Sequence, residues 1–242
     1  MLRHLIARIN SAIPSQCAIC HAWPARTVCE ACVTRFAQPC SRCATCALPV
    51  PQGLAQCGAC VKAAPPLDRC LAAVSYGYPW SDCIGRFKFR QSPGWAGTLA
   101  TLLRSTPWVE PALEAADRVV PVPLSAQRLK ERGFNQALEL ARCLSARKTD
   151  ARLLLRIRHT LPQSELVRAE RLRNVAGAFA VDPLRAIELR GLRIVLVDDV
   201  MTSGASLFSA AVALRQAGAA HITAMVVART DEAGFTPAAA AQ

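Results

Sequence analysis

One stretch decides the fold: IVLVDDVMTSGAS, which runs from Ile194 to Ser206. Its first four residues are apolar and mostly β-branched, which is typical of a strand buried on both faces of a parallel sheet. Asp198 and Asp199 follow where this strand is expected to end, and a polar loop then leads through Gly204 into a helical pattern over 206–216. Ligands of open α/β sheets bind beyond the carboxyl ends of the strands. The stretch therefore predicts a parallel sheet with a ligand site at its edge.

The chemistry of this loop indicates a phosphorylated sugar. Backbone N–H groups at a helix N-terminus favour a phosphate dianion, and the hydroxyls of Thr202, Ser203 and Ser206 add uncharged donors. The two carboxylates need partners, and vicinal ribose hydroxyls would supply them. A capped strand–turn–helix with solvated acids is the alternative. We favour a ribose 5-phosphate site, because the whole stretch closely resembles the motif by which type I phosphoribosyltransferases bind phosphoribosyl pyrophosphate (PRPP).

Composition bounds the domain organisation and the partners. A chain of 242 residues, 52% of them apolar, has room for one medium domain and a small one. The formal charge of +12 predicts attraction to polyanions such as nucleotides, pyrophosphate or nucleic acid. No apolar run reaches the length of a membrane span, and Arg8 and Asn10 interrupt any signal-peptide core within Met1–Ile13. We therefore expect no membrane span, no export and a cytoplasmic location.

The front of the chain is rich in cysteine. Of the 12 cysteines, nine precede residue 61: Cys17, Cys20, Cys29, Cys32, Cys40, Cys43, Cys46, Cys57 and Cys60. Two C-x2-C pairs, Cys17/Cys20 and Cys29/Cys32, form a four-sulfur set that suits tetrahedral zinc. The alternative is a disulfide framework, which expects an exported protein. The spacing therefore predicts a structural zinc site.

A second zinc site is predicted from the remaining cysteines. Cys57 and Cys60 need a second pair, and both Cys40/Cys43 and Cys43/Cys46 have the required spacing. We prefer Cys43/Cys46, because it directly precedes the letters ALP, which resemble the knuckle of a zinc ribbon. With few apolar residues nearby, metal would supply most of the folding free energy of this region, about 10–16 kcal/mol per site.

Beyond the proline pair at 65–66, strand and helix patterns alternate. Besides the central strand, strands are expected over 71–78, 117–123, 152–158, 178–181 and 222–229, and helices over 81–90, 94–103, 128–147 and 206–216. This alternation predicts a parallel sheet covered on both faces. The expected organisation is an amphipathic helix over 1–14, a cysteine-rich domain over 15–66, the α/β sheet domain over 67–232 and a disordered tail over 233–242.

Two further stretches carry basic side chains. VPVPL at 120–124 leads into RLKERGFNQ at 128–136, and a polar stretch over 156–175 follows. From 128 to 173 there are twelve Arg and Lys against five Asp and Glu, so this segment has a charge of +7. Each basic cluster alone is typical of a solvated face. Beside a ribose-phosphate motif, we interpret them as anion-binding.

Taken together, these motifs resemble the ComF/GntX family. The resemblance rests on the cysteine knuckles, VPVPL with RGFNQ, T-x-PQS…R…RNV and VDDVMTSG, and it covers about residues 15–230. It implies a double zinc ribbon joined to a type I phosphoribosyltransferase domain in the bacterial cytoplasm. It also implies a link to DNA uptake in natural transformation. Ser203 departs from the commoner threonine, and Thr202 stands where purine-type relatives have an acid, which disfavours purine salvage.

The resemblance implies roles for particular residues. Asp198 and Asp199 would be the catalytic acids that hold the ribose. PRPP, with Mg²⁺ on its pyrophosphate, would contact Met201, Thr202, Ser203, Gly204, Ala205, Ser206, Arg128, Arg132, Gln163, Arg168 and Arg171. The two structural zinc ions would be held by Cys17, Cys20, Cys29 and Cys32 and by Cys43, Cys46, Cys57 and Cys60.

Three functions compete at this stage. The first is a catalytic phosphoribosyltransferase acting on an acceptor that the sequence does not name. The second is a competence factor that binds single-stranded DNA through the segment 128–173 and keeps a vestigial or sensory PRPP site. The third is a scaffold whose zinc domain recruits a partner such as a competence helicase. The intact acid pair and loop favour ligand binding in each case.

Overall fold

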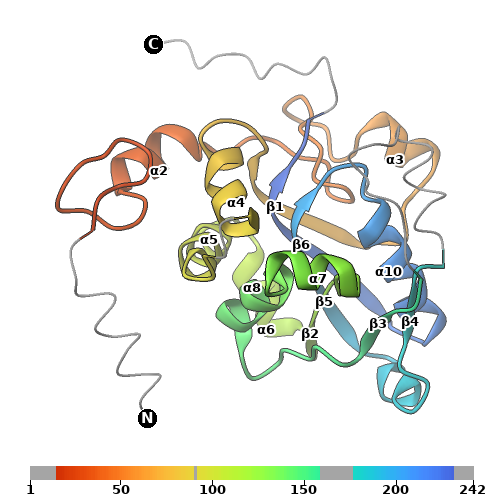
Figure 1. Cartoon of the computed structure of the whole chain (residues 1–242). Helices are drawn as coiled ribbons and strands as arrows, with labels where there is room; N and C mark the ends of the chain where they lie inside the picture. Colours follow the sequence, from red (N-terminus) through yellow and green to blue (C-terminus); the bar gives the residue numbers. More distant parts are fainter. Residues whose placement is uncertain (1–14, 90–91, 159–176, 232–242) are drawn as a thin grey trace.

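The computed structural model describes residues 15–89, 92–158 and 177–231. The predicted helix over 1–14, the tail, and the residues Gln163, Arg168 and Arg171 lie outside the described residues. The described chain forms a four-stranded parallel sheet in the order β1–β6–β5–β2 (Figure 1). Its strands are β1 (Arg69–Ser75), β2 (Arg118–Pro121), β5 (Arg193–Met201) and β6 (His221–Arg229). The predicted parallel α/β fold is confirmed.

Helices cover both faces because successive strand residues point to opposite sides. Val195 and Val197 of β5 pack on the face covered by α4 (Trp80–Phe89), α5 (Trp95–Arg104), α6 (Val109–Ala115) and α8 (Gln136–Ser145). Ile194 and Leu196 pack on the other face, under α10 (Ala205–Gln216). The apolar run that predicted a buried strand is therefore divided between two cores.

The predicted helix over 128–147 is two helices, α7 (Ala126–Arg132) and α8. Gly133 ends α7 with a left-handed φ of 76°, a conformation that glycine adopts without steric cost. The Asn135 side chain then caps α8 by accepting hydrogen bonds from the backbone N–H groups of Ala137 and Leu138. The apolar residues behind the prediction, from Phe134 to Leu144, all follow this break, and α7 buries none of its residues, so the apolar pattern did not locate the start of the second helix.

Two short strands do not join the parallel sheet. β3 (Leu154–Arg156) and β4 (Phe179–Val181) pair with each other as an antiparallel ribbon. Leu154, Phe179 and Val181 are buried in the core beneath α10. A 3-10 turn (Ala186–Leu189) follows the ribbon and leads into β5. The sequence predicted these strands but not their separation from the sheet.

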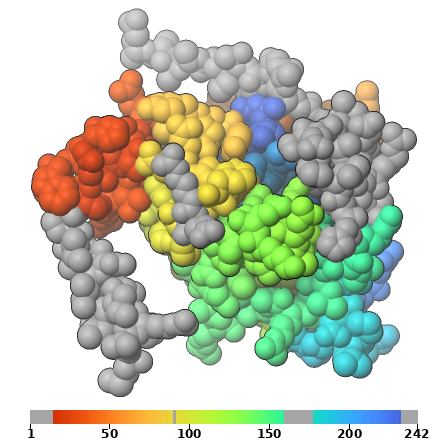
Figure 2. All heavy atoms as spheres, in the orientation of Figure 1, coloured from red at the N-terminus to blue at the C-terminus, as the bar shows by residue number. Residues whose placement is uncertain are grey.

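The cysteine-rich segment is divided between the two sides of the sheet. The first part contains α2 (Glu30–Phe36), and Trp80 Nε1 of α4 donates a hydrogen bond to the Phe36 carbonyl at 2.7 Å. The second part contains α3 (Gly58–Lys62), and its buried cysteines join the core beneath α10. Figure 1 shows α2 at the left beside α4 and α3 at the right. In Figure 2 the first part (red) projects from the body of the molecule.

Within the described ranges, none of the helices has the length and apolar character that crossing a membrane requires.

Candidate functional site

A cavity of about 220 Å³ opens at the carboxyl end of β5. It is lined by Asp198–Thr202 and the first turn of α10, by the segment 122–124, by residues of α7 and α8, and by Tyr76, Lys88 and Arg156. These groups come from parts of the chain that are far apart in sequence. The cavity is therefore the place where the acid pair, the predicted phosphate loop and several basic side chains meet.

The acid pair lies inside β5, whereas the sequence placed it after the strand. The ladder with β6 continues past Asp198 to Met201, which pairs with Arg229. Asp198 Oδ1 accepts a hydrogen bond from the Asp199 backbone N–H at 2.8 Å. Burial, and then the charge of Asp199, raise the pKa of Asp198 to about 7. The Asp198 carboxylate is thus held by the backbone, and its raised pKa brings its protonation close to neutral pH.

Lys88 is a site residue that sequence reasoning missed. Its Nζ lies 2.8 Å from Asp199 Oδ1, and the Asp199 side chain is only 8% exposed. Lys88 comes from the last turn of α4, and nothing in its local pattern distinguishes it from a solvated lysine. Only the packing of α4 against the carboxyl end of the sheet brings this cation to the acid pair.

The loop after β5 has the geometry of a phosphate cradle. Gly204 has a φ of 81°, and a Cβ there would lie 2.6 Å from Met201 Cε and from Phe208 Cζ, so glycine is required. Thr202, Gly204, Ala205 and Ser206 line the cavity at the N-terminus of α10. Ser203 is buried, and its Oγ accepts a hydrogen bond from the Ala205 N–H at 3.4 Å.

Three arginines complete the lining. Arg128 and Arg132 come from α7, and Arg156 comes from β3. The Arg132 guanidinium lies over the Phe89 ring, and its Nη1 donates to Gln136 Oε1 at 2.9 Å. Burial, and then the charge of Arg128, lower the pKa of Arg156. Together with Lys88, four basic groups face two acids among the described lining residues, so the cavity suits a polyanion.

Gln136 adds a hydrogen-bond donor to this wall. The residue is buried, and its Nε2 has no hydrogen-bond partner among the described residues. A buried amide donor of this kind is stabilised when a ligand supplies the acceptor. The residue lines the cavity beside the arginines.

The residues around the acids suit Mg²⁺ with PRPP. Magnesium prefers carboxylate oxygens together with substrate phosphates, and it retains several waters. Asp198 and Asp199 offer such oxygens next to the N-terminus of α10 and the arginines.

The cysteines form two compact sets of four: Cys17, Cys20, Cys29 and Cys32, and then Cys43, Cys46, Cys57 and Cys60. Within each set the sulfur atoms lie within 4.8 Å of one another. Three separations are 3.8 Å (Cys17–Cys32), 3.6 Å (Cys20–Cys29) and 3.7 Å (Cys46–Cys57). Sulfurs on a tetrahedron with Zn–S bonds of about 2.3 Å would lie about 3.8 Å apart. Both sets therefore fit zinc, and Cys40 stays exposed outside them.

Backbone amides support a thiolate in each set. Burial would raise the pKa of Cys17, but the backbone N–H groups of Cys20 and Cys29 outweigh it and lower the pKa to about 6. In the second set, burial is similarly outweighed by the N–H groups of Cys57 and Cys46, which lower the pKa of Cys43 to about 7. Burial raises the pKa of Cys32 to about 12 and that of Cys46 to about 11, so Cys17 and Cys43 ionise more readily than these two thiols. Thiolate is the form that binds metal.

A parallel sheet with an acid pair and a glycine turn at its carboxyl edge is the arrangement that the sequence predicted for a phosphoribosyltransferase domain. Residues 129–238 match the family model described as "Phosphoribosyl transferase domain". The DNA utilization protein YhgH of Salmonella typhimurium is 32% identical over 232 residues, 90% of this chain and 98% of that protein. The chain belongs to the family of YhgH and competence protein F, which confirms the ComF-type family that the sequence motifs predicted.

Two competence proteins are further relatives. Competence protein F of Haemophilus influenzae is 34% identical over 182 residues, which cover 72% of this chain and 78% of that protein. Competence protein ComFC of Bacillus subtilis is 31% identical over 157 residues, which cover 64% of this chain and 62% of that protein.

Proposed function

We propose that the cavity at the end of β5 binds PRPP, or a related ribose 5-phosphate, together with Mg²⁺. The observation that carries this proposal is the meeting of Asp198 and Asp199 with the α10 N-terminus and four basic side chains in one cavity. The acids would accept hydrogen bonds from the ribose hydroxyls, and the Thr202–Ser206 loop would hold the 5-phosphate. Lys88, Arg128, Arg132 and Arg156 would neutralise the pyrophosphate.

Phosphoribosyl transfer is the reaction that this arrangement suits. The bond between the anomeric carbon and a pyrophosphate oxygen breaks, and an acceptor atom forms the new bond, so the protein need not supply a nucleophile. The residues would fix the ribose and stabilise the charge on the departing pyrophosphate. Bound Mg²⁺ would supply further positive charge to that leaving group. Whether an acceptor is present decides between transfer and PRPP sensing.

Calorimetric titration of PRPP with Mg²⁺ into the full chain tests the proposal. Asp199→Asn removes a charged hydrogen-bond acceptor, and we expect a loss of about 10–100-fold in affinity. Glu139→Gln is the matched control, because it removes the same charge from a surface pair on α8. Absence of Mg²⁺-dependent PRPP binding by the wild type would overturn the proposal.

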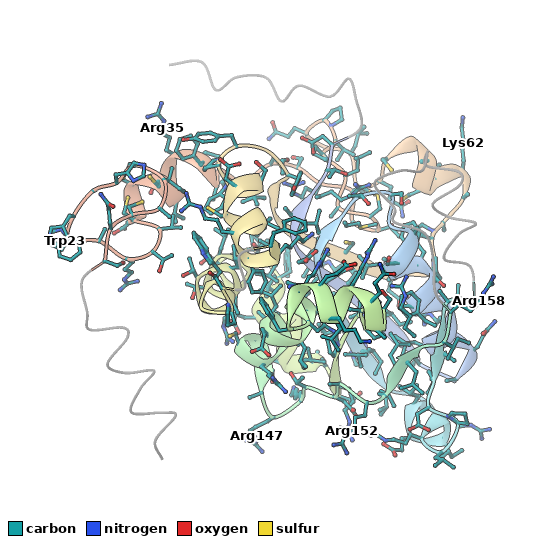
Figure 3. The ribbon with its side chains drawn as sticks, in the orientation of Figure 1. Trp23, Arg35, Lys62, Arg147, Arg152 and Arg158 are labelled. Atoms are coloured by element: carbon teal, nitrogen blue, oxygen red, sulfur yellow. The ribbon has the colours of Figure 1, made fainter. Side chains whose placement is uncertain are left out.

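Lys88→Met separates two roles for the lysine. If Lys88 contacts the pyrophosphate, affinity falls by roughly tenfold. If it only neutralises Asp199, PRPP with Mg²⁺ binds unchanged or more tightly. Lys62→Met is the control, because Lys62 of α3 is exposed, points outward in Figure 3 and is not among the residues that line the cavity.

Binding of single-stranded DNA is a second candidate function. It is supported by the relatives named for DNA utilization and competence, by the +12 charge, and by exposed basic side chains outside the cavity. Figure 3 shows Arg147, Arg152 and Arg158 pointing outward from the molecule. Binding through such contacts should weaken with salt, with a slope near −0.7 per phosphate contact. Salt-independent binding would contradict this role.

The remaining assignments belong to the same proposal. Two structural zinc ions would occupy the cysteine sets of a double zinc ribbon over 15–66, ahead of the phosphoribosyltransferase domain over 67–232. A reducing, cytoplasmic location would keep these thiols available for metal. A helicase partner stays a prediction from the family resemblance.

A further inference from the structure

Arg229 connects the second cysteine set to the loop after β5. It is the last residue of β6 and is only 3% exposed. Its Nε donates to the carbonyl of Cys46 at 3.0 Å, and its Nη1 donates to the carbonyl of Met201 at 3.1 Å. The same Nη1 also donates to the carbonyls of Thr202 and Thr230. One planar guanidinium therefore joins the Cys43–Cys46 knuckle to Met201 and Thr202 at the end of β5.

Cys70 makes a second connection between the same two places. Its backbone N–H donates to the carbonyl of Ala44, inside the Cys43–Cys46 knuckle, at 2.8 Å. Its Sγ donates to Met201 Sδ at 3.6 Å. Both connections thus end on Met201.

Met201 in turn controls the shape of the loop. Its Cε lies 2.6 Å from the position that a Cβ of Gly204 would take, so the methionine packs directly against the turn that begins α10. A displaced knuckle would move Met201 and leave the carbonyl of Thr202 without its donor. The turn would then lose the support that aims its N–H groups at the cavity.

The first cysteine set has different contacts. Cys17 and Cys32 pack with Trp80 and Phe87 of α4, on the opposite side of the sheet. The contacts described for this set lead to α4 rather than to the loop after β5. Among the described residues, the second set is therefore connected to the loop that lines the cavity, whereas the first set packs on α4.

We propose that Arg229 is a positioning residue that couples metal retention at the second cysteine set to the order of the Met201–Gly204 loop. When the knuckle holds its metal, Arg229 and Cys70 hold Met201 in place, and the loop is preformed for a phosphate. When the metal leaves, the loop loses order. The coupling rests on the zinc proposed above for the second set, and its consequence for PRPP affinity rests on the proposed PRPP site.

Hydrogen exchange of the zinc-loaded full chain tests this coupling without PRPP. Arg229→Gln is expected to speed amide exchange in Met201–Gly204 at least tenfold. It should also speed metal release from the second set on addition of a chelator, read by alkylation of the cysteine-containing peptides. Release from the first set should not change. Arg42→Gln is the matched control, because Arg42 donates to Ala47 of the same knuckle and to Ser75 but makes no described contact with the loop.

Arg229→Lys keeps the experiment decisive if the glutamine variant does not fold. Lysine retains the charge but lacks the planar fork that reaches Cys46 and Met201 together, so both changes are expected at smaller amplitude. Wild-type exchange of the loop in either folded variant would overturn the coupling. Equal acceleration in the Arg42→Gln variant would also overturn it. If the wild type fails to bind PRPP while the Arg229 variants show the expected faster exchange, the proposed PRPP site is wrong and the coupling stands.

Discussion

The two cysteine sets share one ligand pattern and differ in their surroundings. Each has two C-x2-C pairs, separated by eight residues in the first set and ten in the second. All four cysteines of the second set are buried, whereas Cys20 of the first is exposed and Cys29 is half-buried. The first set packs against α4, and the second packs in the core beneath α10, next to the loop after β5. The spacing of the cysteines thus predicts the metal ligands, and the packing around each set decides which part of the fold would be affected by loss of the metal.

The largest expected difference between the two sets is in global stability. Cys46→Ser should abolish the second site and leave a polar group in the main core. The loss of metal-coupled folding energy, on the order of 10 kcal/mol, is comparable to the whole stability of a typical domain. Cys20→Ser should leave the cooperative unfolding of the sheet in place. Thermal unfolding followed by circular dichroism checks this, and equal melting temperatures for the two variants would break the comparison.

The order of metal loss sharpens the comparison. A chelator should remove zinc from the first set before the second, with rates that differ by at least tenfold, because Cys20 is accessible to solvent. Mass spectrometry of the intact protein counts the metals, and alkylation of the cysteines shows which set has opened. Simultaneous loss would mean that both sets open in one global unfolding event.

The pH dependence of ligand binding tests the role of Asp198 in the cavity beside the second set. Because the pKa of Asp198 is raised to about 7, the carboxylate becomes protonated as the pH falls through that value. PRPP affinity should then fall by up to about tenfold per pH unit, since the ionised acid is the form that accepts hydrogen bonds and binds Mg²⁺. Calorimetry between pH 6 and pH 8 measures this, and an Asp198→Asn variant should lose the dependence.

Ionisation of Asp198 strengthens ligand binding but lowers the folding stability of the protein. The folded pKa of this carboxyl lies above its ordinary value of 3.8, so the native state binds the proton more tightly than the unfolded chain. Stability therefore falls as the pH rises between these two pKa values. Asp198→Asn should raise the melting temperature at pH 8 although it weakens binding. An unchanged or lower melting temperature would mean that burial of this charge does not limit stability.

The smallest expected effect is that of PRPP on metal binding at the second set. If the loop and the second knuckle are coupled, saturating PRPP should raise the metal affinity of the second set by about fivefold, the lower end of typical allosteric coupling, and so slow the loss of metal to a chelator. Release from the first set should not respond. The alkylation assay used for chelation measures both, and an equal response of the two sets would show general stabilisation instead.

The sequence predicted the features that depend on neighbouring residues. The stretch Ile194–Ser206 contains its strand, turn and helix start within one local pattern, and the structure forms β5, the Gly204 turn and α10 there. The C-x2-C pairs were predictable for the same reason. The choice of Cys43/Cys46 over Cys40/Cys43 agrees with the four sulfurs that the structure brings together.

Features that depend on distant residues were not predictable. Lys88 and Arg229 look like ordinary helix and strand cations, and only the packing of α4 and β6 gives them their partners. The break at Gly133 was missed because the apolar pattern that predicted the helix lies entirely after it, and α7 buries none of its residues. The division of the cysteine-rich segment was also hidden, since spacing carries no information about which face of a sheet each knuckle covers.

The contact between Arg229 and Cys46 also bears on how the chain folds during synthesis. The two residues are 183 positions apart, so the second knuckle leaves the ribosome long before its partner strand exists. At 5–20 residues per second, the wait is roughly 10–40 s. Throughout that time the face that will meet β6 is uncovered. A nascent chain could bind its metal early, but this knuckle gains its final neighbours only when the last strand arrives.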